Sequence, residues 1–431
     1  MEKKSSKVKL QEVTRNLMRL EGNARACVMV EPLFIIPHNL FITYTSVYMV
    51  ALGCTDKQIG LIASVSLIFQ MFFSIIGGYV TDKLGRKRTS LIFDLISWCI
   101  PTLIWAVAQN FYFFLVAAII NSLVRIVHTS WSCLLIEDTP PEDRVHVFSW
   151  IQVAGILAGF VAPIGGLLVR RFELVPAVRG LYFFAFISMT TMVFLRNHLV
   201  NETKQGIARM KEAKNENFLS SMDGYKSAIK KLISTPYTMV AFLLSVFTNI
   251  NNIIRMNFFA IVLTQKLEFS QQSLSFFPVV QSAIMLLVYL FVMPALGKLN
   301  FKKPLMSALA AMVLSNLLLV FSPKQSFLMI ILSTTLTAYG TAVSFPFVES
   351  ILANSIDDNE RAKTMSILFV ILYGLTAPFG YIGGILSSVS EELPFVMMIA
   401  IFIICLFLVG LLSRLEKKQI KDTIRDEALE I

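Results

Sequence analysis

The chain has 431 residues, of which 55% are hydrophobic and only 15% are charged. Soluble globular proteins carry about 25% charged residues, so this composition excludes an ordinary soluble domain and indicates an integral membrane protein. The net charge of +10 would suggest nucleic-acid binding in a soluble chain, but here we expect it to follow the membrane topology and expect no nucleic-acid partner.

Apolar residues come in repeated blocks of roughly 20 to 28, long enough at 1.5 Å per residue for helices to cross a hydrocarbon core about 30 Å thick. A β-barrel would require short alternating segments, and none is visible. The expected fold is an all-α membrane protein with twelve transmembrane helices. The spans are predicted at residues 26–50, 58–81, 89–108, 111–136, 147–169, 177–196, 236–263, 272–296, 304–321, 326–353, 364–387 and 394–413.

A long polar stretch divides the spans into two groups of six. The expected parts are an N-terminal tail over 1–25, six-helix domains over 26–196 and 236–413, a linker over 197–235 and a C-terminal tail over 414–431. The side with the tails and the linker carries 30 of the 38 Lys and Arg residues, and the other side carries six. The positive-inside rule therefore predicts that both termini are in the cytoplasm, and the expected location is the cell (plasma) membrane. The polar, basic first 25 residues do not resemble a cleaved signal peptide.

Ionisable side chains deep in the spans are few, and such residues tend to face a cavity or a partner because their burial in lipid is costly. They occur in spans 1, 4, 7 and 10, the first helix of each group of three, and are Glu31, His38, Arg125, His128, Arg255 and Glu349. Asn252 shares a helical face with Arg255. The alternatives are that Glu31 reaches the membrane interface and that the two histidines only pack.

The chemistry of these groups suits a substrate and proton cavity. A buried carboxyl such as Glu31 can bind and release a proton, and histidines titrate near neutral pH. Arg125 provides a fixed positive charge for an anion or an acid. The predicted cavity residues are Glu31, His38, Arg125, His128, Asn252 and Arg255.

Small residues in the spans are predicted to serve packing. Gly155 and Gly159, like Gly380 and Gly384, have the four-residue spacing that lets two helices approach closely. The five cysteines are scattered, with no spacing typical of a metal site or a disulfide framework, and are expected to pack in the core.

The turn between spans 2 and 3 carries the motif Gly78-x-x-x-Asp82-Lys83-x-Gly85-Arg86-Lys87. The two halves of the chain also look like copies of one another, since Arg144 and Pro163 in the first half recur as Arg361 and Pro378 in the second. The copy of the motif, "GKLNFKK" from Gly297, keeps the basic residues but has Phe301 where Asp82 stands. A parallel six-plus-six repeat is one of the builds of secondary transporters.

The motif, its position, the twelve spans and the repeat resemble the major facilitator superfamily. The resemblance implies alternating access by two six-helix domains that rock around a central cavity lined by spans 1, 4, 7 and 10. Bacterial proton-coupled efflux pumps of that family are the members that the chain resembles most. Those pumps carry Arg-x-x-Gln-Gly in span 4, whereas this chain has His128 and Thr129 after Arg125.

The resemblance also implies a cytoplasmic gate. Asp82 would meet the start of span 11 near Arg361, and Arg86 would meet an acid at the end of span 4. Glu137 or Asp138 is expected there, with Asp94 as another choice, and the second copy of the motif would form a weaker latch. The predicted gate residues are Gly78, Asp82, Lys83, Gly85, Arg86, Lys87, Glu137, Asp138, Glu349 and Arg361.

The sequence has no phosphate loop and no His-Glu-x-x-His or clustered Cys/His site, so we expect no enzyme and no cofactor, and a proton gradient as the energy source. The expected function is secondary active, proton-coupled export of small organic or amphipathic compounds. The partners would be the lipid bilayer, a small-molecule substrate and protons, and the chain is expected to be a monomer. The alternatives are proton-coupled uptake of a nutrient such as a sugar or an organic anion, and a non-transporting membrane receptor or scaffold.

Overall fold

The structure is a computed structural model that describes residues 20–215, 236–297, 299–354 and 361–429. The secondary structure in these residues is helical throughout, without a strand. Twelve of the helical stretches are long and apolar enough to cross a membrane. The prediction of an all-α protein with twelve spans is therefore confirmed. Most of the expected N-terminal tail and the second part of the linker lie outside the described residues.

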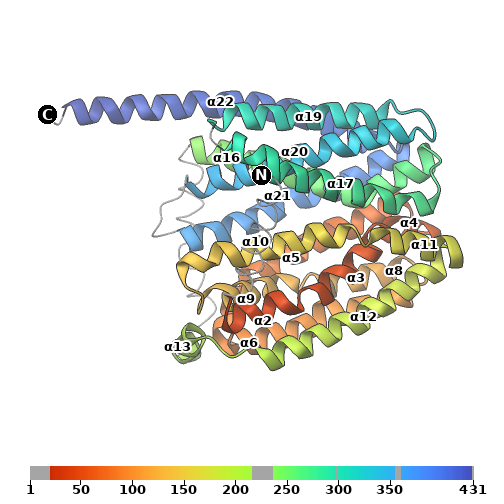
Figure 1. Cartoon of the computed structure of the whole chain (residues 1–431), viewed down its shortest axis with the longest axis horizontal. Helices are drawn as coiled ribbons and strands as arrows, with labels where there is room; N and C mark the ends of the chain where they lie inside the picture. Colours follow the sequence, from red (N-terminus) through yellow and green to blue (C-terminus); the bar gives the residue numbers. More distant parts are fainter. Residues whose placement is uncertain (1–19, 216–235, 298, 355–360, 430–431) are drawn as a thin grey trace, which may run out of the picture. The chain divides into compact units, whose positions relative to one another are not determined.

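In the described residues, the first half of the chain contains six spans and, in the linker, the helix α13 (Figure 1). Its helices are α2 (Gly22–Val30), α3 (Pro32–Ile42), α4 (Thr45–Ala51), α5 (Asp56–Leu84), α6 (Arg86–Asp94), α7 (Ile100–Ala106), α8 (Phe111–Asn121), α9 (Val124–Ile136), α10 (Pro141–Gly159), α11 (Ala162–Phe172), α12 (Leu174–Leu199) and α13 (Lys204–Glu212). A π-helical turn, η1 (Leu95–Cys99), joins α6 to α7, and a 3₁₀ turn, η2 (Ala213–Asn215), follows α13.

The second half contains the other six spans (Figure 1). Its helices are α16 (Pro236–Ile261), α17 (Phe276–Leu287), α18 (Met293–Leu296), α19 (Lys302–Val320), α20 (Phe327–Asn354), α21 (Arg361–Val389) and α22 (Leu393–Leu429). Short π-helical or 3₁₀ turns extend or join them at η3 (Val262–Lys266), η4 (Gln271–Ser275) and η5 (Val288–Val292).

Several spans are interrupted where the sequence disfavours a continuous helix. The first span is interrupted between α2 and α3 at Glu31, directly before Pro32, which has no N–H to donate. Glu31 itself keeps helical backbone angles, and its N–H still donates to the carbonyl of Cys27 at 3.1 Å. The fifth span breaks between α10 and α11 next to Pro163. The break in span 1 matters for function because it lies at an acidic residue.

The contacts divide the chain into two compact units that do not follow a simple split at the linker. One unit contains residues 1–42 and 72–221, and the other contains residues 43–71 and 222–431. The long helix α5 therefore contributes its first half to the second unit and its second half to the first unit.

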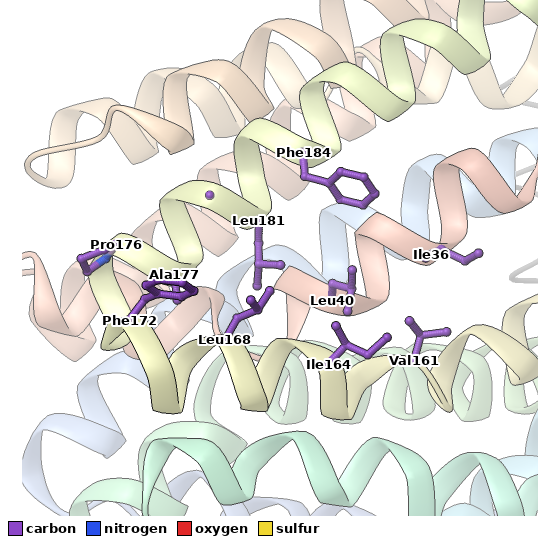
Figure 2. Close-up of a pocket in the computed structure, with 11 residues that line it drawn as sticks. Ile36, Leu40, Val161, Ile164, Leu168, Phe172, Pro176, Ala177, Leu181 and Phe184 are labelled. Atoms are coloured by element: carbon purple, nitrogen blue, oxygen red, sulfur yellow. The ribbon is translucent and has the colours of Figure 1, made fainter.

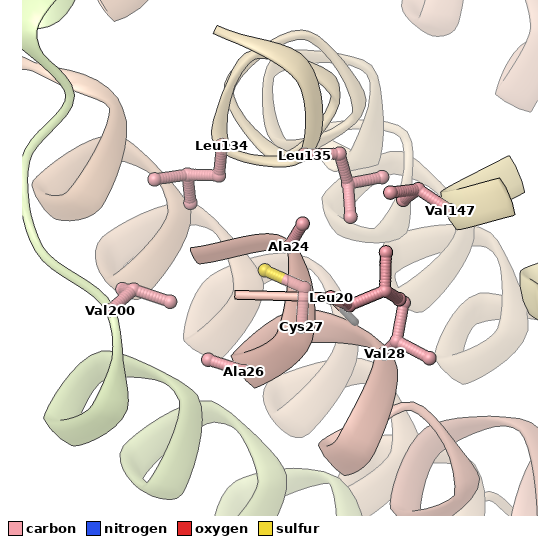
Figure 3. Close-up of a cluster of buried hydrophobic side chains, with 9 residues drawn as sticks. All are labelled: Leu20, Ala24, Ala26, Cys27, Val28, Leu134, Leu135, Val147 and Val200. Carbon is pink, nitrogen blue, oxygen red and sulfur yellow. The ribbon is translucent and has the colours of Figure 1, made fainter. Parts of the chain in front are cut away.

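A small apolar cluster in the first unit anchors the start of the first span (Figure 3). Leu20, Cys27 and Val28 pack there against Leu134 and Leu135 from the end of α9. The start of α2 is also tied to the chain after α12. The amide of Asn23 donates to the carbonyl of Asn201 at 2.9 Å, and its oxygen accepts from the backbone N–H of Asn201 at 2.8 Å. The linker thus begins from a fixed position within this unit.

In the second unit, the first half of α5 packs closely against α21. A Cβ on Gly60 would lie 2.5 Å from the carbonyl oxygen of Gly380 and 2.9 Å from the Cα of Gly384, so the glycine spacing predicted for packing does serve a close helix contact here. By contrast, a Cβ on Gly155 would meet only Ile35, at 3.9 Å.

The hydroxyl of Ser64 reinforces this contact. It donates to the carbonyl of Ala377 at 2.5 Å and accepts from the N–H of Tyr381 at 2.8 Å. These two backbone groups are four residues apart, the spacing of an α-helical hydrogen bond, and Pro378 lies between them. A side chain of α5 therefore bridges the backbone of α21 next to its internal proline.

Candidate functional site

Three charged side chains are buried together in the first unit. Glu31, at the break between α2 and α3, is 8% exposed, Asp94 at the end of α6 is 3% exposed, and Arg196 on α12 is 4% exposed. Arg196 donates to the carboxylate of Asp94, which forms an ion pair. Glu31 is close enough for the charges of both partners to act on it.

The sequence predicted only part of this group. Glu31 was expected in a cavity, but Asp94 was considered as a partner of Arg86, and Arg196 was placed at a span end. The pairing of Asp94 with Arg196 corrects that alternative. The available signal was an acid inside span 3, since a charged group inside an apolar span usually has a partner, which here comes from the end of span 6.

His38 lies in an aromatic cluster. Its ring is stacked on Phe34 with 5.7 Å between centroids, and it meets Phe41 and Trp98 edge-on at 5.3 and 5.7 Å. The described contacts of this side chain are with aromatic rings, which favours the packing alternative that the sequence left open.

On α9, Arg125 is partly exposed and His128 is exposed. The His128 ring lies 6.4 Å from that of Trp131. The second half of α5 packs on this helix, because a Cβ on Gly77 would lie 3.1 Å from the hydroxyl of Thr129 and 3.5 Å from the carbonyl oxygen of Arg125. The motif residue Gly78, by contrast, faces open space.

In the second unit, Arg255 and Asn252 lie on α16. The Arg255 guanidinium covers the ring of Phe259 at 4.5 Å from its centroid, and its Nη1 is buried without a hydrogen-bond partner among the described residues. Asn252 is exposed, whereas its neighbour Asn251 is buried. This half therefore offers a cation that retains unused hydrogen-bonding capacity.

The turn between α5 and α6 is the centre of an ion network. Arg86, which is 3% exposed, donates to Glu137 from Nε at 3.1 Å and from Nη2 at 2.9 Å, and to Asp82 from Nη1 at 2.9 Å. Glu137 was one of the two acids expected to meet Arg86. Asp138 is exposed and accepts instead from the backbone N–H of Lys204, at 3.4 Å.

The beginning of the linker completes this network. The Glu202 carboxylate accepts from the backbone N–H groups of Arg86 and Lys87 at 2.9 and 3.0 Å, which caps α6. Thr203 donates to Glu137, and Arg209 on α13 donates to Asp82 at 3.2 Å. The sequence did not predict these contacts, because the linker was treated only as a connection between domains.

The pKa of Arg209 and the backbone conformation of Gly85 are both consistent with the ion network at this turn. The hydrogen bond to Glu212 and the charge of Asp82 raise the pKa of Arg209. Gly85 has a φ of 85°, which only glycine adopts easily, and a Cβ there would lie 2.5 Å from the Glu202 carboxylate. Close approach of the linker thus requires glycine at this position.

The remaining predicted gate residues have weaker or undescribed contacts. Lys83 is exposed, and its ammonium lies 4.8 Å from the centre of the Tyr79 ring. Lys87 contributes its backbone N–H, and Glu349 is half-buried on α20. The side chain of Arg361 lies outside the described residues, so the expected contact between Asp82 and the start of span 11 stays a prediction.

The chain belongs to the major facilitator superfamily, because the model of that family matches residues 33–299 and 249–429. This family and this fold are those of membrane transporters and not of enzymes. Among curated relatives, it is 31% identical over 153 residues to an uncharacterized MFS-type transporter, YqjV of Bacillus subtilis. This alignment covers 33% of the present chain and 37% of YqjV. It is 26% identical over 160 residues to the quinolone resistance protein NorA of Staphylococcus aureus, and this alignment covers 34% of the present chain and 41% of NorA. These matches span about two fifths of each relative.

Solved transporters share the fold at low sequence identity. The nucleoside transporter NupG is similar with a TM-score of 0.68 and 17% identity, covering 92% of this chain and 100% of NupG. A bacterial homolog of the human lysosomal transporter Spinster, in an inward-facing and unoccupied conformation, is similar with a TM-score of 0.69 and 15% identity, covering 92% of this chain and 97% of that one. At these identities the likeness concerns the fold alone.

Proposed function

We propose that the chain is a proton-coupled exporter of small organic or amphipathic compounds that works by alternating access. The observation that carries the proposal is the buried carboxyl of Glu31, directly before the proline inside span 1 and next to the ion pair of Asp94 and Arg196. A buried carboxyl beside other charges binds or releases a proton when those charges or its access to water change. Similarity to a quinolone resistance protein supports export.

Proton coupling is tested with purified protein in liposomes that contain a pH-sensitive dye. Wild-type protein should move protons when a transported compound, such as a cationic dye, is added. Glu31→Gln should bind the compound but lose most of the proton movement. The matched control is Glu21→Gln, an exposed acid just before α2, which should behave like wild type. Normal proton movement by Glu31→Gln would reject coupling through this residue.

Uptake of an organic anion is a second candidate, favoured by the buried Nη1 of Arg255 that lacks a hydrogen-bond partner among the described residues. An available guanidinium suits a carboxylate or phosphate group. Cells that express the chain should resist toxic dyes if it exports them, and should gain no protection if it imports nutrients. Anion counterflow that Arg255→Gln abolishes would support uptake, whereas ligand binding without counterflow would indicate a receptor.

For the ion network around Arg86 we propose the role of a cytoplasmic latch, in a monomer that lies in the cell membrane with both termini in the cytoplasm. The described bonds all join residues of one unit, so the latch would act by holding the shape of the α5–α6 turn. Asp82→Asn should change the access of single cysteines to reagents from the two membrane sides. If Asp82→Asn leaves the reactivity of the cysteines unchanged, the network does not act as a latch. Reporter fusions at each terminus test whether both termini are in the cytoplasm.

A further inference from the structure

The first unit has an apolar groove between α3, α11 and α12, with a volume of about 550 Å³ (Figure 2). Figure 2 shows side chains of these three helices directed toward it. The helices pack against one another around the groove. Its lining residues include Leu40 of α3, Ile164, Leu168 and Phe172 of α11, and Leu181 and Phe184 of α12.

The groove exists because small residues leave space and its walls face outward. A Cβ on Gly180, which lines the groove, would meet no atom within 4 Å. Ile164, Phe172 and Phe184 are 51%, 51% and 47% exposed, so the groove is not sealed inside the unit. Water would form no hydrogen bonds with these apolar walls. The three helices belong to membrane spans, so the molecules available to occupy the groove are the hydrocarbon chains of lipids.

One end of the groove meets two exposed arginines. The turn from α11 to α12 consists of a single residue, Glu173, with a φ of 63°. Arg170 and Arg171 lie in the last turn of α11 and are exposed. The guanidinium of Arg171 lies 5.4 Å from the centre of the Phe172 ring, which itself lines the groove. The groove therefore ends at a rim with two exposed arginines and one exposed acid, Glu173, which leaves a net positive charge.

The dimensions match half of a bilayer. From Pro176 at the rim to Phe184, eight residues of α12 rise about 12 Å, which is close to one leaflet of a hydrocarbon core about 30 Å thick. Arginines at the end of a transmembrane helix lie at the level of lipid head groups. Arg179 is engaged elsewhere, because it donates to the carbonyl of Ala108 at 2.8 Å.

We propose that this groove binds one acyl chain of an anionic phospholipid, whose phosphate is held by Arg170 and Arg171. An acyl chain alone gains little selectivity, because the surrounding lipid is equally apolar. The charge of the head group at a basic rim between helices supplies the preference. Glu31, Asp94 and Arg196 do not line the groove, so lipid binding there does not depend on which compound is transported.

The test uses the full chain in nanodiscs of phosphatidylcholine with increasing phosphatidylglycerol, and native mass spectrometry counts the lipids that stay bound. Wild-type protein should retain one phosphatidylglycerol at least about fivefold better than phosphatidylcholine. The Arg170→Gln/Arg171→Gln double variant should lose that preference. Gly180→Phe should retain neither lipid at this site, because the ring fills the groove, and Gly180→Leu serves if the larger residue prevents folding.

Two matched controls separate the site from general effects. Gly410→Phe places the same side chain at another position with open space on a membrane helix, and Lys57→Gln removes an exposed basic residue from the first turn of another membrane helix, α5. Both should retain phosphatidylglycerol like wild type. Equal retention of the two lipids by wild type, normal retention by both Gly180 variants, or the same loss in the controls would overturn the proposal.

Discussion

Two turns at corresponding places in the two halves of the chain are built differently. In the first half, the turn at Gly85 is surrounded by the ion network of Arg86 and is capped by Glu202. In the second half, the turn between α18 and α19 is closed by Asn300, whose side chain accepts from the N–H of Lys302 at 3.1 Å, and Phe301 is buried there. The repeat thus preserves a turn followed by basic residues, and of the two turns, the one in the first half has the ion pairs with acids that the structure describes.

Among the substitutions that distinguish the two turns, replacement of Glu137 should cause the largest loss of stability. Glu137→Leu leaves the guanidinium of Arg86 buried with one acid fewer, and should lower the free energy of unfolding by roughly 3 kcal/mol. Denaturant unfolding in detergent micelles measures the change. Asp138→Asn, at the exposed neighbouring acid, should be nearly silent. An Arg86→Leu/Glu137→Leu double variant should recover part of the loss, and a double variant that is additive would show that the two residues are not coupled.

Alanine at Gly85, and at Gly297 near the second turn, compares the backbones of the two turns, although in the repeat Gly297 stands where Gly78 does. Gly85→Ala forces a side chain into a φ of 85° and toward the Glu202 carboxylate, and should cost about 1–3 kcal/mol. Gly297→Ala has an ordinary φ of −62°, and its Cβ would lie 3.3 Å from the carbonyl oxygen of Met293, so it should change stability by less than about 0.5 kcal/mol. Equal shifts in the unfolding midpoint would contradict the comparison.

The two caps should differ less. Glu202→Ala removes the acceptor of two backbone N–H groups at the start of α6, and should cost about 1 to 2 kcal/mol. Asn300→Ala removes the acceptor of one N–H group in the second half and should cost about 0.5 to 1 kcal/mol. Hydrogen exchange of the first-turn amides of α6 and α19 measures each effect locally, and a larger effect at α19 would reverse the expected order.

Arg209 should have the smallest effect of the set. Its side chain is 41% exposed, and solvent screens its pair with Asp82, so Arg209→Gln should cost less than about 0.5 kcal/mol. Added salt should reduce even that difference. Thermal unfolding of both proteins at low and high ionic strength measures it. A loss as large as that of Glu137→Leu would mean that α13, and not α9, is the main support of the turn.

The features that could be predicted from the sequence are those set by the length of the apolar segments and by local motifs. Blocks of apolar residues define the twelve spans because a helix must satisfy its own hydrogen bonds in lipid. The motif and the family resemblance predicted that Arg86 would meet an acid at the end of span 4, but they left Glu137 and Asp138 open, and the structure shows Glu137. The contacts of Glu202 and Arg209 were missed because a polar linker shows no pattern that says where it docks. The pair of Asp94 and Arg196 was missed because its members are far apart in sequence, and only a structure brings them together.

The bridge from Ser64 to α21 also sets an order on biosynthesis. Ser64 leaves the ribosome 313 residues before its first partner, Ala377, and 317 residues before Tyr381. Until span 11 is inserted, Gly60 and Ser64 must face lipid or a membrane chaperone, because the surface that covers them has not yet been made. A chain truncated before α21 would leave this face of α5 bare, which makes the newly made first half a natural target for quality control.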